Sequence, residues 1–180
     1  MRVIAGVARG HPLIAPRGRG TRPITDRVKE TLFGILGHRV PEARVLDLYA
    51  GCGAIGIEAL SRGSVHVTFV EHSRAAIVSL RANLERTDLA AAATVAASDM
   101  ERFLSGTHEG PWDLVFLDPP YELRAIVAPL RAVEPHLARD AMVVIKHFWR
   151  TEVHEMASLQ SVRQRRFGET MLSFLEAPGR

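Results

Sequence analysis

From residue 44 onward, short apolar runs alternate with amphipathic stretches. The apolar runs predict strands over residues 45–50, 65–71, 94–97, 113–118, 141–146, 162–167 and 170–176. The amphipathic stretches predict helices over residues 54–62, 74–86, 99–104, 123–137 and 151–158. Because strands that alternate with helices need crossover connections, the pattern predicts an α/β fold, with a mostly parallel sheet and helices on both faces. The last two strands flank Gly168, which predicts an antiparallel hairpin.

The start of the chain follows another pattern. The first 24 residues are rich in Gly, Pro and Arg and hold few apolar residues, which predicts a hairpin or a loosely folded arm. A helix follows, because Thr25 or Asp26 can cap its start and Gly37 can end it. We therefore divide the chain into a basic arm with one helix, residues 1–40, and a larger domain, residues 41–180.

Basic residues are concentrated in this arm. Residues 1–40 carry eight Arg and Lys residues against two acidic residues, whereas residues 41–180 carry 15 basic and 18 acidic residues. The asymmetry indicates a polyanionic partner, although arginines that only solvate an exposed arm would give the same composition. For an RNA partner, we expect phosphate contacts from Arg9, Arg17, Arg19, Arg22, Arg27 and Lys29.

Several classes of protein are disfavoured by the sequence. It holds no run of about 18 apolar residues for a membrane span, and its N-terminal apolar stretch ends too early for a signal peptide. The single cysteine, Cys52, cannot form an internal disulfide and fits a reducing compartment. No Cys and His residues have zinc-ligand spacing. We therefore expect a cytoplasmic monomer without a metal.

A glycine-rich turn follows the first strand of the larger domain. Gly51, Gly53 and Gly56 form the pattern G-x-G-x-x-G, and doubly wound sheets bind ligands beyond the carboxyl ends of their strands, where this turn falls. Glycines let the backbone approach a ligand closely. Glu71, at the end of the next strand, can bind a ribose. NAD and S-adenosylmethionine both contain that ribose, so these residues leave both cofactors open.

Asp47 distinguishes the two cofactors. A carboxylate just before the turn would repel a pyrophosphate, whereas it can organise the ammonium group of S-adenosylmethionine directly or through water. The sequence therefore favours S-adenosylmethionine. Asp99 follows the third strand, where it could reach the adenine amino group, but it could equally cap the next helix.

The tetrapeptide Asp118-Pro119-Pro120-Tyr121 ends the strand predicted over residues 113–118. The Asp118 carboxylate and the Pro119 carbonyl can accept hydrogen bonds from an exocyclic amino group, and the Tyr121 ring can stack on the base that carries it. The alternative is a strand that ends in a proline turn. We assign catalysis of amino-group methylation to Asp118, Pro119 and Tyr121.

Together these motifs resemble the class I S-adenosylmethionine-dependent methyltransferases, and among them the bacterial 16S rRNA guanine-N2 methyltransferase family. The resemblance covers nearly the whole chain, with matching segments at residues 1–6, 21–23, 26–33, 46–53, 56–63, 116–121 and 168–170. It implies a Rossmann-like methyltransferase domain over residues 41–180 and an RNA-contacting extension over residues 1–40. It also implies methyl transfer to a guanine N2 of small-subunit ribosomal RNA, on an assembled or assembling 30S particle.

Three other functions stay open at this point: a DNA amino-methyltransferase, an NAD-dependent oxidoreductase and a non-catalytic RNA-binding protein. The chain also departs from the family pattern at three places. Ile24 replaces a small polar residue, Cys52 replaces a common serine, and residues 146–149 (Lys-His-Phe-Trp) stand where an acidic residue is expected. The last departure leaves the fine specificity for substrate open.

Overall fold

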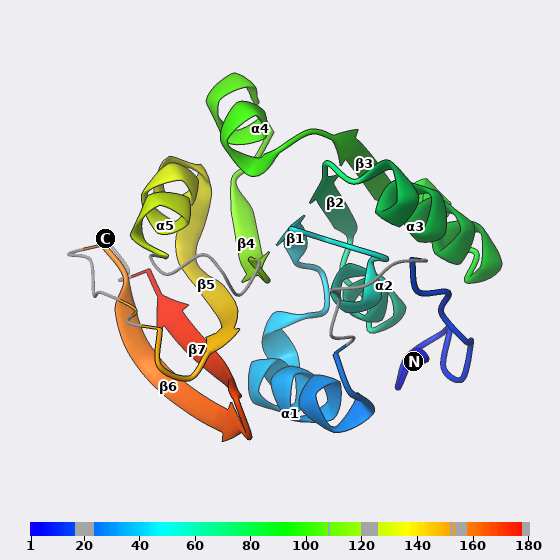
Figure 1. The fold of residues 1–180 in the computed structure, drawn as a ribbon, viewed down its shortest axis with the longest axis horizontal. Coiled ribbons are helices and arrows are strands. Elements are labelled where there is room, and N and C mark those ends of the chain that lie inside the picture. The colour runs from blue at the N-terminus through cyan, green and yellow to red at the C-terminus, as the bar shows by residue number, and fades with distance from the viewer. Residues whose placement is uncertain (17–23, 108, 120–125, 152, 154–157, 178–180) are drawn as a thin grey trace.

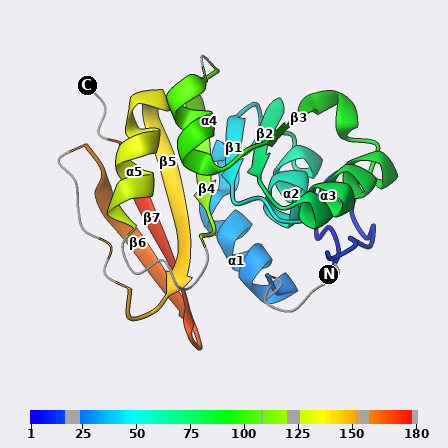
Figure 2. The ribbon, with the colours of Figure 1, turned by 45° about the horizontal axis from the view of Figure 1, so that its top comes forward.

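The computed structural model describes residues 1–16, 24–107, 109–119, 126–151, 153 and 158–177. A seven-stranded sheet forms the centre, and helices cover both of its faces (Figures 1 and 2). This arrangement confirms the predicted α/β fold. In the part of the chain that is described, no helix combines the length and apolar character needed to cross a bilayer.

The strands are β1 (Arg44–Leu48), β2 (His66–Glu71), β3 (Ala93–Ala97), β4 (Trp112–Leu117), β5 (Leu137–Phe148), β6 (Gln160–Phe167) and β7 (Thr170–Glu176). The α-helices are α1 (Asp26–Leu36), α2 (Ala54–Ser61), α3 (Arg74–Arg86), α4 (Met100–Gly106) and α5 (Val127–Val133). Short 3-10 turns span Gly37–Arg39, Ala90–Ala92 and Glu134–His136. The strand order is β3-β2-β1-β4-β5-β7-β6. The first five strands pair in parallel, and β7 is antiparallel to both β5 and β6.

Local sequence signals set the ends of α1 and α3. The Thr25 side chain accepts a hydrogen bond from the Val28 N–H at 3.4 Å, and Gly37, with φ 51°, ends α1. Ser73 caps α3 in the same way by accepting from the Ala76 N–H at 3.5 Å. Both helices therefore have the predicted bounds, because polar caps satisfy backbone groups that a helix end leaves without partners.

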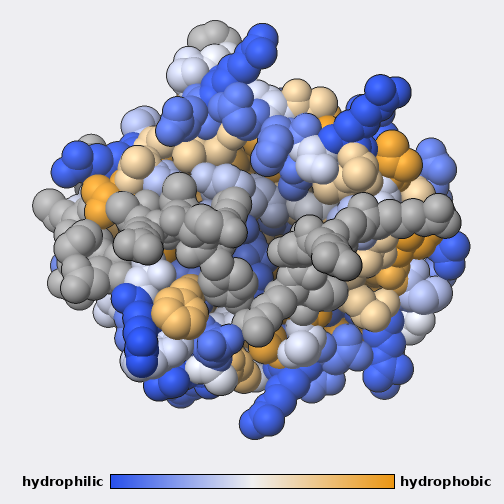
Figure 3. All heavy atoms as spheres, viewed as in Figure 1, coloured by the Kyte–Doolittle hydropathy of each residue, from blue (hydrophilic) through white to orange (hydrophobic). Residues whose placement is uncertain are grey.

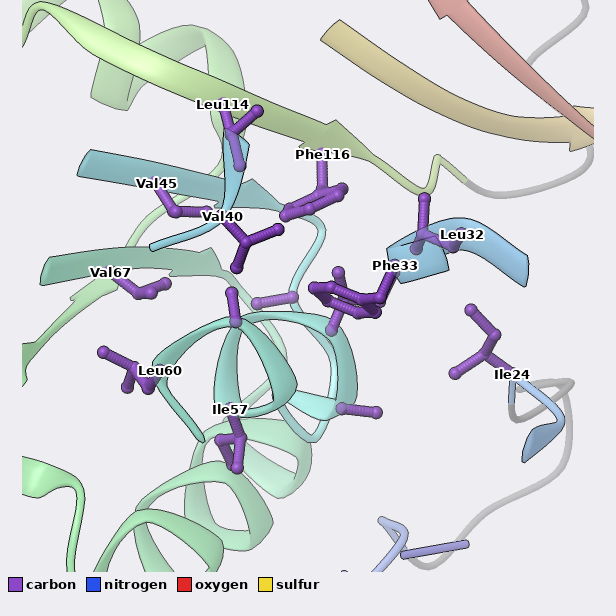
Figure 4. Close-up of a cluster of buried hydrophobic side chains, with 14 of the residues drawn as sticks. Ile24, Leu32, Phe33, Val40, Val45, Ile57, Leu60, Val67, Leu114 and Phe116 are labelled. Atoms are coloured by element: carbon purple, nitrogen blue, oxygen red, sulfur yellow. The ribbon is translucent and has the colours of Figure 1, made fainter. Parts of the chain in front are cut away.

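Alternate residues of β1 build two separate cores. Val45 packs with α1, α2 and α3 on one face of the sheet, whereas Leu46 and Leu48 pack with α4 and α5 on the other. On the first face, Phe33 of α1 and Phe116 of β4 have ring centroids 6.0 Å apart (Figure 4). Strands buried on both faces read as continuous apolar runs, which is why the central strands could be predicted from sequence.

The helix predicted over residues 123–137 is too long at its end. In the structure α5 ends at Val133 and a 3-10 turn containing Pro135 follows. A proline lacks the N–H that would continue the helix, so the predicted extension past it is wrong. The helix predicted over residues 151–158 falls mostly outside the described residues.

Strand β5 is longer than predicted. It begins at Leu137, not at residue 141, and Asp140 within it has a positive φ of 58°. The pairing with β4 also shifts register between Trp112 and Leu114. These irregularities interrupt the alternation of side chains, so the sequence pattern misses the first part of the strand.

The N-terminal arm forms a hairpin that packs on the larger domain. The Val3 N–H donates to the His11 carbonyl at 3.0 Å, and the Gly10 N–H donates to the Val3 carbonyl at 2.9 Å. Val3, Ala8 and Leu13 are buried in the same core as α1 and β1. The hairpin alternative is thus confirmed, whereas the functional division at residue 40 stays a prediction.

Glu58 of α2 is a buried carboxylate that anchors the arm. It accepts hydrogen bonds from the Ile4 N–H at 2.8 Å, the Ala5 N–H at 3.0 Å, Lys29 Nζ at 3.1 Å and Arg62 Nε at 2.8 Å. The side chains of Lys29 and Glu58 both have 0% exposure. Lys29 cannot reach a phosphate from this position, so the expectation that it contacts RNA is wrong.

We predict that Lys29→Met destabilises the protein by about 3 kcal/mol, because Glu58 then loses a buried counter-ion. Urea unfolding followed by circular dichroism would measure the change. Arg2→Ala is the matched control, since it removes only the exposed pair with Asp26 at 3.1 Å, and it should cost less than about 1 kcal/mol. Equal stability of the two variants would contradict the anchoring role of the buried pair.

Candidate active site at the carboxyl ends of the strands

The structure brings four predicted acidic residues to one edge of the sheet. They are Asp47 in β1, Glu71 at the end of β2, Asp99 two residues after the end of β3 and Asp118 directly after β4. The alignment follows from parallel pairing, which places Leu48 opposite both Val70 and Leu117. This edge is where ligands of doubly wound sheets bind.

The glycines of the turn differ in what surrounds them. Gly51 has φ 56° and open space where a side chain would stand, so a ligand can approach its backbone. Gly53 has φ 79°, and a Cβ there would lie 2.2 Å from Leu80 Cδ1. A Cβ on Gly56 would lie 2.2 Å from Phe69 Cε1. Gly53 and Gly56 therefore permit close packing of the helix on the sheet, and Gly51 is the glycine that faces open space.

Asp47 is an almost fully buried carboxylate, with 1% exposure. It accepts a hydrogen bond from the Gly56 N–H at 3.0 Å. Burial raises the pKa of Asp47 to about 7, the Gly56 hydrogen bond opposes that rise, and the nearby charges of Asp118 and Glu71 add to it. The site therefore stabilises the neutral form of Asp47 until a positive charge is placed beside it.

A cavity of about 290 Å³ opens beside β2 and α4. Its lining includes Glu71 and Asp99, so two of the predicted residues share one cavity. The Glu71 carboxylate accepts from the Gly51 N–H at 2.9 Å and from the Ser73 N–H at 2.7 Å, which couples the glycine turn to the cavity wall. The Asp99 side chain accepts from the Arg102 N–H at 2.8 Å and thus caps α4. Asp99 therefore caps α4 and lines the cavity at the same time.

Tyr49 also lines this cavity and was missed by the sequence analysis. Its φ of 63° is uncommon for a residue with a bulky side chain, and such conformations gather at functional sites. Burial raises the pKa of Tyr49, and the charges of Glu101 and Asp99 raise it further. The signal available in the sequence was an aromatic residue directly ahead of the glycine turn.

Asp118 forms an ion pair with Lys146, the first residue of the segment 146–149 that departs from the family pattern. Lys146 Nζ lies 2.6 Å from Asp118 Oδ1 and 2.7 Å from Oδ2. Burial raises the pKa of Asp118, while the charge and hydrogen bonds of Lys146 act to lower it. Pro119, which follows Asp118 in the sequence, is buried. Tyr121 lies outside the described residues.

The residues after Lys146 extend along the β6–β7 hairpin. His147 contacts Ser173 Oγ through Nε2 at 2.9 Å, and burial lowers the pKa of His147. Trp149 has two guanidinium groups over its ring, Arg166 at 4.0 Å and Arg150 at 4.6 Å from the ring centroid. The contacts of His147 with Ser173 and of Trp149 with Arg166 connect the end of β5 and the residue after it to the β6–β7 hairpin.

The predicted RNA contacts are only partly described. Arg9 and Arg27 are exposed, on the arm and on α1 respectively. Arg17, Arg19 and Arg22 lie outside the described residues.

Comparison with known proteins places the chain among methyltransferases. Residues 1–176 match the profile of a family described as Conserved hypothetical protein 95. The chain is 39% identical over 150 residues to Ribosomal RNA small subunit methyltransferase D of Escherichia coli K12, covering 81% of this chain and 74% of that protein. It is 37% identical over 184 residues to a Bacillus subtilis protein provisionally named rRNA methyltransferase YlbH, covering 99% of this chain and 100% of that protein.

Solved structures agree with these matches. A structure from Escherichia coli, provisionally titled methyltransferase yhhF, superposes with a TM-score of 0.88 at 32% identity and covers 100% of this chain and 99% of that chain. A protein from Thermus thermophilus superposes with a TM-score of 0.81 at 29% identity and covers 97% of this chain and 98% of that chain.

The raised pKa of Asp47 predicts how stability depends on pH. Because the folded-state pKa is raised from 3.8 to about 7, the contribution of Asp47 to stability is fully present only below about pH 3.8 and is lost progressively as pH rises to about 7. Asp47→Asn stays neutral, so it should gain stability relative to the unchanged protein as pH rises from about 5 to 8. Urea unfolding at both pH values measures this difference, and a difference independent of pH would contradict it.

Proposed function

The chain belongs to the family described as Conserved hypothetical protein 95, and we propose that it uses S-adenosylmethionine to methylate the N2 amino group of a guanine in 16S ribosomal RNA. Relatives named as small-subunit ribosomal RNA methyltransferases support this proposal. The observation that carries it is that Asp118, directly after β4, and Asp47, in the neighbouring strand β1, lie at one edge of the sheet, where the charge of Asp118 acts on Asp47. An acceptor for an amino group thus shares this edge with a carboxylate suited to a cationic methyl donor.

The residues at the sheet edge fit S-adenosylmethionine better than NAD. A positive charge would relieve the mutual repulsion of Asp47, Glu71 and Asp118, whereas a pyrophosphate would add to it. We assign binding of the cofactor to Asp47, Gly51, Gly53, Glu71 and Asp99. Gly51 offers open backbone, Gly53 shapes the turn, and Glu71 and Asp99 line the adjoining cavity. When bound, the cofactor supplies a methyl group on a positively charged sulfur.

The residues of the tetrapeptide position the target amino group. The Asp118 carboxylate and the Pro119 carbonyl accept its hydrogens, which directs the nitrogen lone pair towards the methyl donor. They would also stabilise the positive charge that grows on the nitrogen as its bond to the methyl carbon forms and the carbon–sulfur bond of the donor breaks, and the nitrogen would then release one proton to solvent. Tyr121 stacks on the guanine. Because N2 lies on the pairing edge of the base, the nucleotide has to be unpaired or turned out of its stack.

The arm and α1 hold the RNA. Arg9 and Arg27 are exposed, and the hydrophilic side chains along the lower border of the face in Figure 3 lie over α1 and the arm as well as over the β6–β7 hairpin. Arg17, Arg19 and Arg22 add three further positive charges in the same part of the sequence. Phosphate contacts of this kind give affinity with little sequence reading. The natural substrate in this proposal is therefore an assembled or assembling 30S particle in the cytoplasm, bound by one protein monomer.

We predict that Asp118→Ala lowers methyl transfer at least about 100-fold, because the amino group loses a charged acceptor. Binding of S-adenosylmethionine, measured by calorimetry, should be largely retained, and NAD should not bind. Asp113→Ala is the matched control, since Asp113 lies near the opposite end of β4 and accepts from the Arg44 N–H at 2.8 Å. Full turnover by Asp118→Ala would sink the catalytic assignment, and binding of NAD alone would overturn the choice of cofactor.

We also predict that reversing the charge of Arg17, Arg19 and Arg22 to Glu weakens RNA binding. If all three contact phosphates, the slope of log affinity against log salt should become less steep by about 3. Arg81→Glu and Arg86→Glu on the exposed face of α3 are the control. Filter binding across a salt series measures the slope, and equal slopes for both sets of variants would exclude the arm as the RNA-contacting element.

A further inference from the structure

Lys146 holds both oxygens of Asp118. Its Nζ donates at 2.6 Å to Oδ1 and at 2.7 Å to Oδ2, which are the short distances of charge-assisted hydrogen bonds. The Lys146 side chain is 9% exposed, whereas that of Asp118 is 28% exposed. The pair is therefore closed on the side of the lysine and open on the side of the aspartate.

The topology of the sheet creates this pair. β4 and β5 are parallel with Leu117 opposite Ile145, so the next residues of the two strands, Asp118 and Lys146, come side by side. On its other side β5 pairs with β7, where Lys146 lies opposite Leu172. Lys146 thus projects from a strand that has neighbours on both sides, and its backbone is held much more firmly than that of a surface lysine.

The geometry leaves room for a substrate. An ionised carboxylate offers about four lone-pair positions, and Lys146 occupies one on each oxygen. A remaining position can accept one hydrogen of an exocyclic amino group, while the Pro119 carbonyl accepts the other. A carboxylate fixed in this way cannot rotate away from the amino group that it receives.

We propose that Lys146 is a positioning residue for the methyl-transfer reaction: it fixes Asp118 as an ionised acceptor, oriented towards the target amino group. This inference rests on the proposed function. It gives a role to Lys146, which belongs to the segment 146–149 where the family pattern leads us to expect an acidic residue. Lys146 acts through Asp118 and does not itself touch the base.

Charge supports the same role. Asp118 contacts Lys146 on β5, and its charge helps to raise the pKa of Asp47 on β1, while burial raises the pKa of both carboxyl groups. Without Lys146, the repulsion between these two carboxylates would favour protonation of one of them. A protonated Asp118 would present an O–H donor where the amino group requires an acceptor.

The test compares Lys146→Met, Lys146→Arg and the unchanged enzyme on 16S RNA. Lys146→Met should lower kcat about 10- to 100-fold with little change in KM, since orientation is lost but RNA contacts remain. The acidic limb of its pH–rate profile should move to higher pH. Lys146→Arg should recover most of the turnover. Arg39→Met is the matched control, because it removes the ion pair with Glu176, which lies away from the catalytic edge, and it should leave kcat unchanged.

The pairing with Asp118 is tested separately by a double variant. In an Asp118→Asn background, Lys146→Met should lower kcat by a much smaller factor than it does in the enzyme with Asp118, because the partner through which Lys146 acts has lost its charge. An equal cost in both backgrounds would overturn the inference. This neutral double variant also keeps the test open if Lys146→Met alone does not fold.

A measurement without RNA separates this inference from the proposed function. Carbon NMR of the Asp118 carboxyl should show a higher pKa in Lys146→Met than in the unchanged protein, and an unchanged pKa would overturn the inference. If the enzyme without substitutions transfers no methyl group to 16S RNA, that result would count against the proposed function alone. Normal turnover and an unshifted pH profile for Lys146→Met would leave the proposed function intact and reject the role of Lys146.

Discussion

The parallel alignment of β1, β4 and β5 is the constraint on which the site depends. Because the three strands run in the same direction and in register, with Leu117 opposite both Leu48 and Ile145, Asp47, Asp118 and Lys146 come to one edge although they are far apart in the sequence. A buried carboxylate, Asp47, and a partly buried one, Asp118, at the same edge are costly, and the structure compensates them with a backbone N–H from Gly56 and an ammonium from Lys146. The edge is thus polarised before any ligand binds.

Sequence reasoning reached most of the fold because the central strands are buried on both faces and the caps of α1 and α3 are explicit. It also brought Asp47, Glu71 and Asp118 together, since strand ends of a parallel sheet converge without knowledge of side-chain detail. It could not find the Lys146–Asp118 pair, which depends on the register of β5 against β4 and on the direction of one long side chain. Periodicity carries neither kind of information.

The position of Lys29 in a basic segment does not indicate its role. A lysine in a basic segment is usually solvated, but this one lies on the face of α1 that meets α2, where Glu58 has already accepted two backbone N–H groups of the arm. The same carboxylate therefore orders the arm and removes one cation from its surface. The proposed RNA-binding face is accordingly defined by the charges left outside this contact, such as Arg9 and Arg27.

The position of β7 has a consequence for synthesis on the ribosome. β7 lies between β5 and β6 in the sheet, yet it follows both in the chain. During translation β5 therefore waits with one open edge, and β6 emerges before the strand on which it will lie. The lysine that holds Asp118 gains its second flanking strand only when residues 170–176 have left the exit tunnel. Completion of this edge of the sheet therefore waits for β7, and a chain stalled before β7 would carry the acidic residues of the site while β5 still has one open edge.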